Sequence, residues 1–272
     1  MSQGTPEIVL VSGYSGVGKS SVVNELHKVL ACSQQPLYAF DSGYVRSKAD
    51  GPRKLSEMGI AGESGGAKTI NVNLYSILGS PTIYKLVQKA VGAEKPRQYC
   101  LSRFAAVEPG NRVIDIGSGP GLAVGYLPQV DYIGFEPSER YVQHARRKYA
   151  NTAKFIQGYF NRAAAEEFKP YDLVLLFGVL HHCDDGTVAR MLTDIAVGLS
   201  PRGRVLTVDP CLTATQSAWA RRVALYDRGN YVRTPEQYTA LASPHLRVAK
   251  CETVDGLLYI PTTVHLAALE HG

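Results

Sequence analysis

Short apolar runs recur downstream of residue 112, separated by segments whose apolar residues have helical spacing. The runs lie at residues 113–116, 132–135, 154–157, 171–177 and 204–208. The run at 171–177 is apolar almost throughout, which is typical of a parallel strand buried on both faces. Strands that alternate with helices predict an α/β domain in which helices cover both faces of a mostly parallel sheet.

Two further apolar segments, at residues 246–254 and 257–269, close this pattern. The Asp255-Gly256 pair between them is typical of a hairpin turn. We therefore expect the last strand of the sheet to run antiparallel to its neighbours.

The stretch from residue 112 to 136 carries the strongest candidate ligand site. An apolar run breaks into glycines at alternate positions, Gly117, Gly119 and Gly121, and a second apolar run ends in Glu136. Alternating glycines let the backbone turn sharply and approach a ligand closely, and the loop is expected to lead to a helix N-terminus. A carboxylate about twenty residues beyond such a loop is placed to bind both hydroxyls of a ribose, so we expect a nucleoside ligand.

An acid before the loop argues against a dinucleotide. Asp115 would repel a pyrophosphate but would attract an ammonium or a sulfonium group. The spacing is G-x-G-x-G, with Leu122 where a dinucleotide fingerprint has its last glycine. A nicotinamide-dependent oxidoreductase is therefore a disfavoured alternative.

The segments VIDIGSGPG and YIGFEPS resemble the cofactor signature of class I S-adenosylmethionine-dependent methyltransferases. The resemblance implies a Rossmann-like α/β fold with a seven-stranded sheet, mostly parallel with the last strand antiparallel, and S-adenosyl-L-methionine as cofactor. It also implies in-line methyl transfer to a small-molecule acceptor. The cofactor-binding residues that it implies are Asp115, Gly117, Ser118, Gly119, Gly121, Glu136, Pro137, Tyr159, Phe177 and Gly178.

Within this set, Asp115 is expected beside the methionine amino group and Glu136 on the ribose hydroxyls. Tyr159 departs from the pattern, because many relatives carry an acid there that binds the adenine amino group. Adenine is therefore expected to be held by stacking, by backbone groups or by Asn161.

Two histidines, His181 and His182, follow the apolar run at 171–177. Ligands of open α/β sheets bind beyond the carboxyl ends of the strands, so the pair is expected to border the reacting centre. A histidine is suited to remove the proton of an acceptor hydroxyl, because its pKa lies near neutrality. Two other interpretations stay open: a His/Cys/Asp metal site, disfavoured because adjacent residues do not easily converge on one ion, and a structural pair that caps the next helix. No metal is expected.

Residues 211–245 exceed what a plain methyltransferase sheet needs between its strands, so they are a candidate lid over the acceptor. Aromatic and arginine side chains in this segment suit an anionic or polyhydroxylated substrate. The candidates are Trp219, Tyr226, Arg228 and Arg233. A plain surface helix would have a similar composition.

A second motif lies near the N-terminus. GYSGVGKS matches the phosphate-binding P-loop G-x-x-x-x-G-K-[ST], with Gly13, Gly18, Lys19 and Ser20 as its defining residues. The segment also resembles the opening of AAA-type ATPase modules, which implies ATP and magnesium. A complete P-loop domain takes some 150 residues, and only about sixty separate this motif from the next domain. A phosphate-binding remnant and an inactive fragment both stay open.

We expect an extension over residues 1–73 that is incomplete and partly linker, with one strand near Leu37–Phe40 ending in Asp41. The methyltransferase domain is expected over residues 74–272, with a first helix that begins after Ser80. The alternative function is an ATP- or GTP-binding protein in which this second domain is only a scaffold.

Composition narrows the expected partners and cellular location of the protein. The net charge of +5 is mild, and arginines and lysines are not clustered with aromatics, so we expect no nucleic-acid partner. The 5 cysteines are scattered and odd in number, which favours reduced thiols in the cytoplasm over a disulfide framework. We expect no membrane span, because no apolar run reaches about eighteen residues, and no signal peptide, because the start MSQGTPEIVLVSG lacks a basic region. The sequence does not indicate the oligomeric state.

Overall fold

The computed structural model describes residues 39–41, 44–47, 51–54, 91–225 and 229–272. The chain divides into two compact units, Met1–Gly79 and Ser80–Gly272. Three of the sequence predictions, the P-loop at residues 13–20, the helix after Ser80 and the linker over 55–73, lie outside the described residues.

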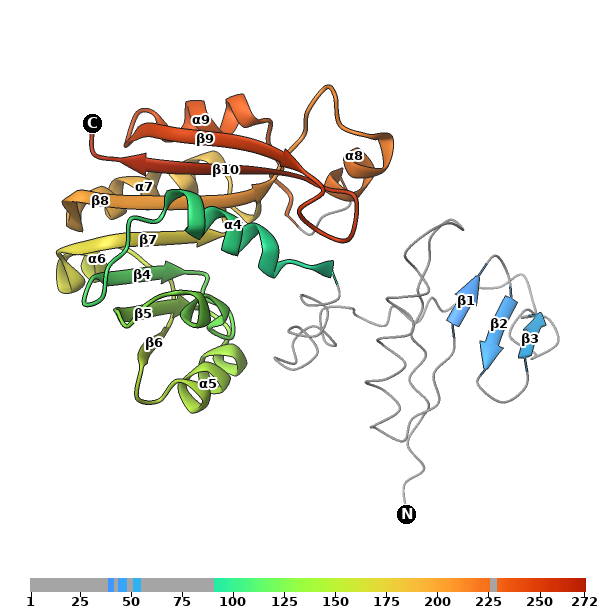
Figure 1. The fold of residues 1–272 in the computed structure, drawn as a ribbon, viewed down its shortest axis with the longest axis horizontal. Helices are drawn as coiled ribbons and strands as arrows, with labels where there is room; N and C mark the ends of the chain where they lie inside the picture. The colour runs from blue at the N-terminus through green and yellow to red at the C-terminus, as the bar shows by residue number, and fades with distance from the viewer. Residues whose placement is uncertain (1–38, 42–43, 48–50, 55–90, 226–228) are drawn as a thin grey trace, which may run out of the picture. The chain divides into compact units, whose positions relative to one another are not determined.

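The described part of the first unit is a three-stranded antiparallel sheet (Figure 1). Its strands are β1 (Ala39–Asp41), β2 (Tyr44–Ser47) and β3 (Gly51–Lys54), with β2 in the middle. The strand expected to end at Asp41 is present. Residues 44–47 and 51–54 belong to the extension that is expected to be partly linker. In the structure they supply two more strands, which pair with β1 and with each other.

The second unit is built on a seven-stranded sheet with the order β6-β5-β4-β7-β8-β10-β9 (Figure 1). The strands are β4 (Arg112–Ile116), β5 (Asp131–Glu136), β6 (Ala153–Gln157), β7 (Tyr171–Phe177), β8 (Leu199–Pro210), β9 (Arg247–Asp255) and β10 (Thr263–Glu270). All neighbours from β6 to β8 pair in parallel, whereas β10 pairs antiparallel with both β8 and β9. The predicted Rossmann-like sheet with an antiparallel last strand is confirmed.

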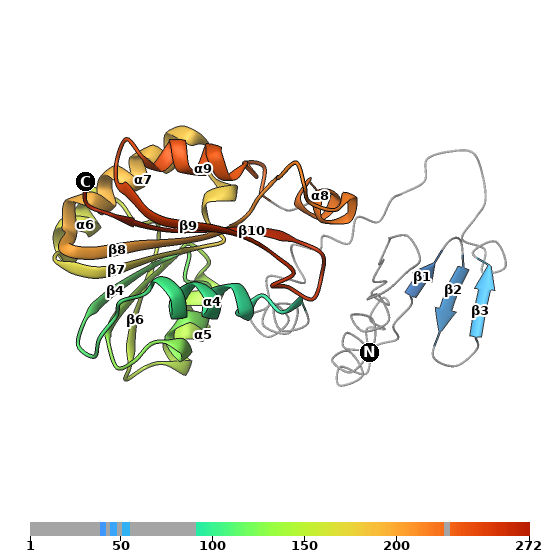
Figure 2. The ribbon, with the colours of Figure 1, turned by 45° about the horizontal axis from the view of Figure 1, so that its top comes forward.

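Helices form a layer on each face of this sheet (Figure 2). On one face lie α4 (Glu94–Phe104) and α5 (Glu139–Lys148), whose buried residues share a hydrophobic cluster with one face of the strands. On the other face lie α6 (Arg162–Phe168), α7 (Asp185–Gly198) and α9 (Pro235–Ala242). A further helix, α8 (Ala218–Leu225), and two short 3-10 helices, η3 (Leu122–Tyr126) and η4 (Leu180–His182), complete the unit.

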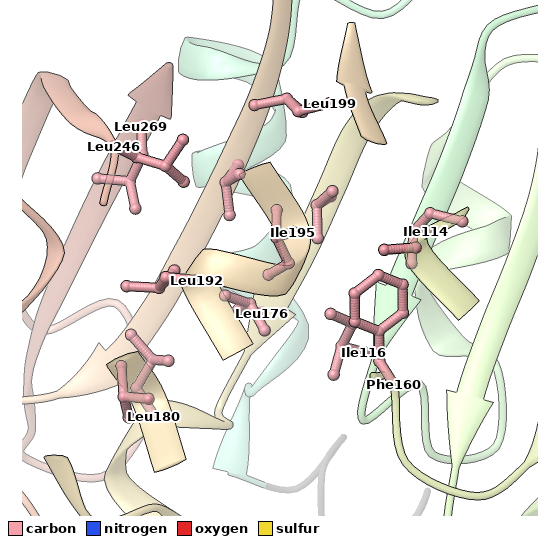
Figure 3. Close-up of a cluster of buried hydrophobic side chains, with 14 of the residues drawn as sticks. Ile114, Ile116, Phe160, Leu176, Leu180, Leu192, Ile195, Leu199, Leu246 and Leu269 are labelled. Atoms are coloured by element: carbon pink, nitrogen blue, oxygen red, sulfur yellow. The ribbon is translucent and has the colours of Figure 1, made fainter. Parts of the chain in front are cut away.

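Alternation along the strands explains how one sheet supports two cores. In β7, Leu173 and Leu175 belong to the cluster beneath α4 and α5, whereas Val174 and Leu176 belong to the cluster beneath α7. Successive side chains of a strand point to opposite faces, so an uninterrupted apolar run is needed where both faces are covered. Figure 3 shows part of the cluster beneath α7, in which Leu192 and Ile195 of α7 lie over the sheet.

The segment expected to be a lid contains a part of this core. Thr234 caps α9 in a capping box with Gln237, and Pro235 occupies the first turn. Tyr238 and Ala242 of α9 are buried in the same hydrophobic cluster as Leu192 and Ile195 of α7. The C-terminal part of residues 211–245 is therefore a layer of the fold. Among the described helices, none is both long and apolar enough to cross a bilayer.

Candidate functional site

A cavity of about 300 Å³ opens where the carboxyl ends of β4, β5 and β7 meet. This is where parallel α/β sheets bind their ligands. The predicted cofactor residues that line it are Asp115, Gly117, Ser118, Gly119, Glu136, Pro137, Tyr159, Phe177 and Gly178. The cavity wall also includes His182, and it includes Arg97 of α4 and Tyr141 of α5, which were not among the residues predicted from the sequence.

Glu136, the last residue of β5, is held by the backbone on both sides. The Gly119 N–H donates to its Oε2 at 3.0 Å, and the Ser138 N–H donates to its Oε1 at 2.8 Å. Burial raises the pKa of this carboxyl, and the two backbone N–H groups oppose the rise. Because a carboxylate has about four lone-pair sites, Glu136 can still accept hydrogen bonds from two ligand hydroxyls.

Asp115 of β4 is 3% exposed and accepts a hydrogen bond from the Tyr132 hydroxyl. Burial raises its pKa to about 7, while the Tyr132 hydrogen bond and the charge of Arg97 act in the opposite direction. A cationic ligand group near this carboxyl would favour its ionised form. The cavity therefore has an acid on β4 and a second acid on β5, as the sequence predicted.

Glycine is required at two positions of the loop between them. Gly117 has φ +73°, and a Cβ there would lie 2.8 Å from Val179 Cγ2. Gly119 has φ +54°, and a Cβ there would meet no atom within 4 Å. Since Gly119 lines the cavity, its missing side chain leaves room for a ligand to contact the backbone.

Gly121 is a correction to the predicted cofactor set. It is not among the residues that line the cavity, and a Cβ there would lie 2.8 Å from Phe155 Cζ. The missing side chain of Gly121 leaves room for the Phe155 ring. The loop also leads into the five-residue 3-10 helix η3, a shorter element than the helix expected there.

The rim of the cavity includes Tyr159, which is 79% exposed. This exposure leaves its ring free to stack on a ligand. Asn161, the alternative contact for adenine, instead caps α6, with its Oδ1 accepting from the Ala164 N–H at 3.1 Å. It is not among the residues that line the cavity.

The two histidines occupy different environments within η4. His182 lines the cavity, whereas His181 is 6% exposed and packs next to Gly178 of the cavity wall, with the two histidine ring centroids 4.0 Å apart. Asp209 Oδ1, at the end of β8, lies 2.7 Å from His181 Nδ1 and accepts from the His181 backbone N–H at 3.1 Å. Burial raises the Asp209 pKa, and the hydrogen bond from His181 lowers it.

Asp209 has a partnership that sequence reasoning missed, because 28 residues separate it from His181. The capping role considered for the histidines belongs to Asp184, whose side chain accepts from the Thr187 N–H of α7 at 2.8 Å. In the part of the chain that the structure describes, no group of three or more His, Cys, Asp or Glu side chains could hold a metal ion.

The residues expected to bind the acceptor are placed away from the cavity or are not described. Trp219 on α8 is 53% exposed and does not line the cavity, while Tyr226 and Arg228 lie outside the described residues. Arg233 corrects the prediction: its side chain is buried and bonded to Asp185 and to backbone carbonyls. It has no N–H left to bind an anionic substrate.

Three solved structures share this fold at low sequence identity. The mitomycin 7-O-methyltransferase MmcR is 22% identical with a TM-score of 0.55, and the match covers 75% of this chain and 62% of that one. The pyocyanin biosynthetic protein PhzM is 18% identical with a TM-score of 0.56, covering 74% of this chain and 62% of that one. CalO1, a methyltransferase in calicheamicin biosynthesis solved in its SAH-bound form, is 18% identical with a TM-score of 0.55, covering 79% and 66%.

The chain thus spans less than two thirds of the length of each of these proteins. No curated protein matches it by sequence. The family model described as a methyltransferase domain matches residues 93–243, more than half of the chain, and this stretch contains both carboxylates, the glycine loop and the histidine pair. The chain therefore belongs to the methyltransferase domain family.

Proposed function

We propose that this protein transfers the methyl group of S-adenosyl-L-methionine to a small-molecule acceptor by in-line displacement. One observation carries the proposal: Asp115 and Glu136, at the ends of neighbouring strands, line one cavity together with a loop whose glycines leave its backbone exposed. Two acids on one nucleoside-sized cavity suit a ligand with a ribose and a positive charge.

The cavity offers matching groups for each part of this cofactor. We assign Glu136 to the ribose hydroxyls, and Tyr159 and Pro137 to the adenine. Arg97 and the ionised form of Asp115, which a cationic ligand group favours, have opposite charges, and this suits the ammonium and carboxylate groups of a free amino acid. Arg97 is an addition to the residues predicted from the sequence.

The bound cofactor supplies a methyl group on a sulfonium. Because the reaction disperses this charge, we expect most of the acceleration to come from holding the acceptor in line with the methyl group. The protein contributes a rigid wall of backbone and aromatic groups, including Phe177 and Gly178 from the end of β7.

If the acceptor is a hydroxyl, its proton must be removed. We assign this role to His181, because the Asp209 carboxylate fixes the Nδ1–H tautomer and stabilises the imidazolium that forms. His182, which lines the cavity beside it, is assigned to the acceptor side of the wall.

Direct titration with S-adenosylhomocysteine tests the proposal. We expect micromolar binding to the full chain by isothermal titration calorimetry, complete loss of binding in Asp115→Ala, and unchanged binding in Lys19→Ala. Binding that survives Asp115→Ala but disappears in Lys19→Ala would instead assign the nucleotide site to the N-terminal P-loop motif. A screen of metabolite pools with methyl-labelled cofactor would then identify the acceptor.

A further inference from the structure

Every hydrogen-bond donor of the Arg233 guanidinium group is used, and most of them bind the segment that carries the two histidines. Its side chain is 8% exposed, and all five of its N–H groups are used. Nη1 donates to the Leu180 and Tyr231 carbonyls at 2.9 and 3.1 Å. Nη2 donates to the Cys183 carbonyl at 2.7 Å and to Asp185 Oδ1 at 2.6 Å, and Nε donates to the same Oδ1 at 3.0 Å.

These bonds hold η4 from both sides of the histidine pair. Leu180 precedes the pair and Cys183 follows it, so one planar group fixes the carbonyls at the two ends of the turn. A 3-10 helix of three residues has few hydrogen bonds of its own with which to hold a shape. The orientation of the histidines therefore depends on contacts from outside the turn.

The backbone around Arg233 joins this turn to the segment that follows Asp209. The Tyr231 N–H donates to the His181 carbonyl at 3.0 Å, and the Leu212 N–H donates to the Arg233 carbonyl at 3.0 Å. Cys211 and Arg233 form an isolated parallel β-bridge. The strand end that carries Asp209 and the turn that carries His181 are thus tied to one short segment.

The same segment lies directly against the His181 ring. A Cβ added at Gly229 would lie 2.1 Å from His181 Cδ2 and 2.4 Å from the His181 carbonyl oxygen. No side chain fits there unless His181 moves. Because the Gly229 backbone leaves no room for even a Cβ beside the ring, we expect a shift of residues 229–233 to shift the imidazole.

We propose that Arg233 is a positioning residue that sets the His181 imidazole against Asp209, and that residues 229–233 act as a clamp on this pair. The inference rests on the proposed function, in which His181 accepts the acceptor's proton. Lysine would not replace Arg233, because its single nitrogen has three donors and lacks the planar fork that reaches three carbonyls and a carboxylate at once.

Nitrogen-15 NMR of histidine-labelled full chain tests the clamp without an identified acceptor, because imidazole nitrogen shifts report the tautomer. The His181 signal is assigned by its absence in His181→Gln. In the wild type we expect the Nδ1–H tautomer, with a downfield proton resonance from the hydrogen bond to Asp209. Arg233→Ala and Arg233→Lys are expected to lose that resonance and to populate the Nε2–H tautomer.

The matched control is Arg247→Ala, which removes another arginine that is bonded to a carboxylate, Glu270, at 2.6 Å. We expect its His181 signal to be that of the wild type. Gly229→Ala perturbs the clamp while retaining Arg233, and it is expected to displace the His181 signal even if both Arg233 variants fail to fold.

A folded Arg233→Ala variant with a wild-type His181 signal would overturn the inference, as would a folded Gly229→Ala variant with one. S-adenosylhomocysteine titration of the same samples separates this failure from failure of the proposed function. We expect binding to change by less than about twofold in the Arg233 variants, because Arg233 is not in the cavity wall. Absence of binding to the wild type would refute the function and leave the NMR result to be judged by itself.

Discussion

The two halves of the site use buried acids in opposite ways. At the ends of β4 and β5, Asp115 and Glu136 line the cavity, and their protein partners leave part of each carboxylate for a ligand. At the ends of β7 and β8, Asp209 is 2% exposed and is directed at His181, while Arg233 binds the turn that carries it. The first half is arranged to bind a ligand, and the second half is arranged to hold the His181 side chain in one orientation.

This difference teaches that burial of an acid does not by itself indicate a ligand site. Asp115 and Asp209 are nearly equal in exposure, and burial raises the pKa of both. What separates them is the partner: a neutral tyrosine hydroxyl for Asp115 and an imidazole for Asp209. Substitutions in the two halves should therefore affect different measurements.

The largest expected effect is on turnover in the second half. Asp209→Asn should lower kcat for a hydroxyl acceptor by about 10² to 10⁴, the usual contribution of general base catalysis. Steady-state kinetics with methyl-labelled cofactor checks this, and the KM for the cofactor should change less than about twofold. A large rise of that KM would show that the two halves are not separable.

Next in size is the loss of cofactor binding in the first half. Glu136→Ala removes the acceptor of the Gly119 and Ser138 N–H groups as well as the expected ribose contact. We expect S-adenosylhomocysteine binding to weaken by about a hundredfold, which is about 2.7 kcal/mol. Calorimetry of this variant and of Asp209→Asn measures the binding of S-adenosylhomocysteine in the two halves of the site. Equal weakening in both variants would contradict the division into a binding half and a positioning half.

Asp115 should make the free energy of unfolding depend on pH. Its pKa in the folded protein is raised from 3.8 to about 7, so the native state holds a proton that the unfolded chain releases. The stability of the ligand-free protein should therefore fall as pH rises through this window. Asp115→Asn should remove the effect and be more stable than the wild type at pH 8, by at most about 4 kcal/mol.

Urea denaturation at several pH values measures this difference. The stability gap between variant and wild type should widen from pH 4 to pH 7 and then level off. A gap that stays constant across that range would mean that Asp115 keeps an ordinary pKa in the folded protein.

A smaller effect is expected within the first half, at Arg97. Arg97→Ala should weaken S-adenosylhomocysteine binding by about tenfold, because the carboxylate of its amino-acid end loses a charged partner. Methylthioadenosine, which lacks that end, should bind the variant and the wild type alike. Equal weakening for the two ligands would place Arg97 near the nucleoside instead.

The smallest expected effect is at Trp219, half exposed on α8 and outside the cavity wall. Trp219→Ala should change S-adenosylhomocysteine binding by less than about twofold and stability by about 0.5 kcal/mol or less. Calorimetry and urea denaturation check both. A strong loss of binding would extend the site to α8.

The sequence predicted what is local in the chain. The strand, glycine loop and second strand of residues 112–136 lie together in sequence, so the cavity at Asp115 and Glu136 followed from spacing. The apolar runs likewise predicted a mostly parallel sheet, because an all-apolar strand such as β7 is typical of a strand that is buried on both faces. The resemblance to the cofactor signature implied that this sheet has seven strands.

The sequence missed what the fold brings together. Asp209 meets His181 across 28 residues, and Arg233 meets Asp185 across 48. An arginine near tyrosines was interpreted as a ligand contact because composition does not reveal which donors are already used. Tyr238 lies within the segment that was expected to be a lid, and only the packing of α9 shows that it belongs to the core.

The position of β10 has a consequence for how this unit is made. Although it follows β9 in the chain, β10 is inserted between β8 and β9 and bonded on both sides. Because the chain is synthesised from its N-terminus, β8 has an unpaired edge until residues 263–270 have left the ribosome. Until then this edge can pair with strands of other nascent chains, so we expect chaperones to bind the incomplete sheet there.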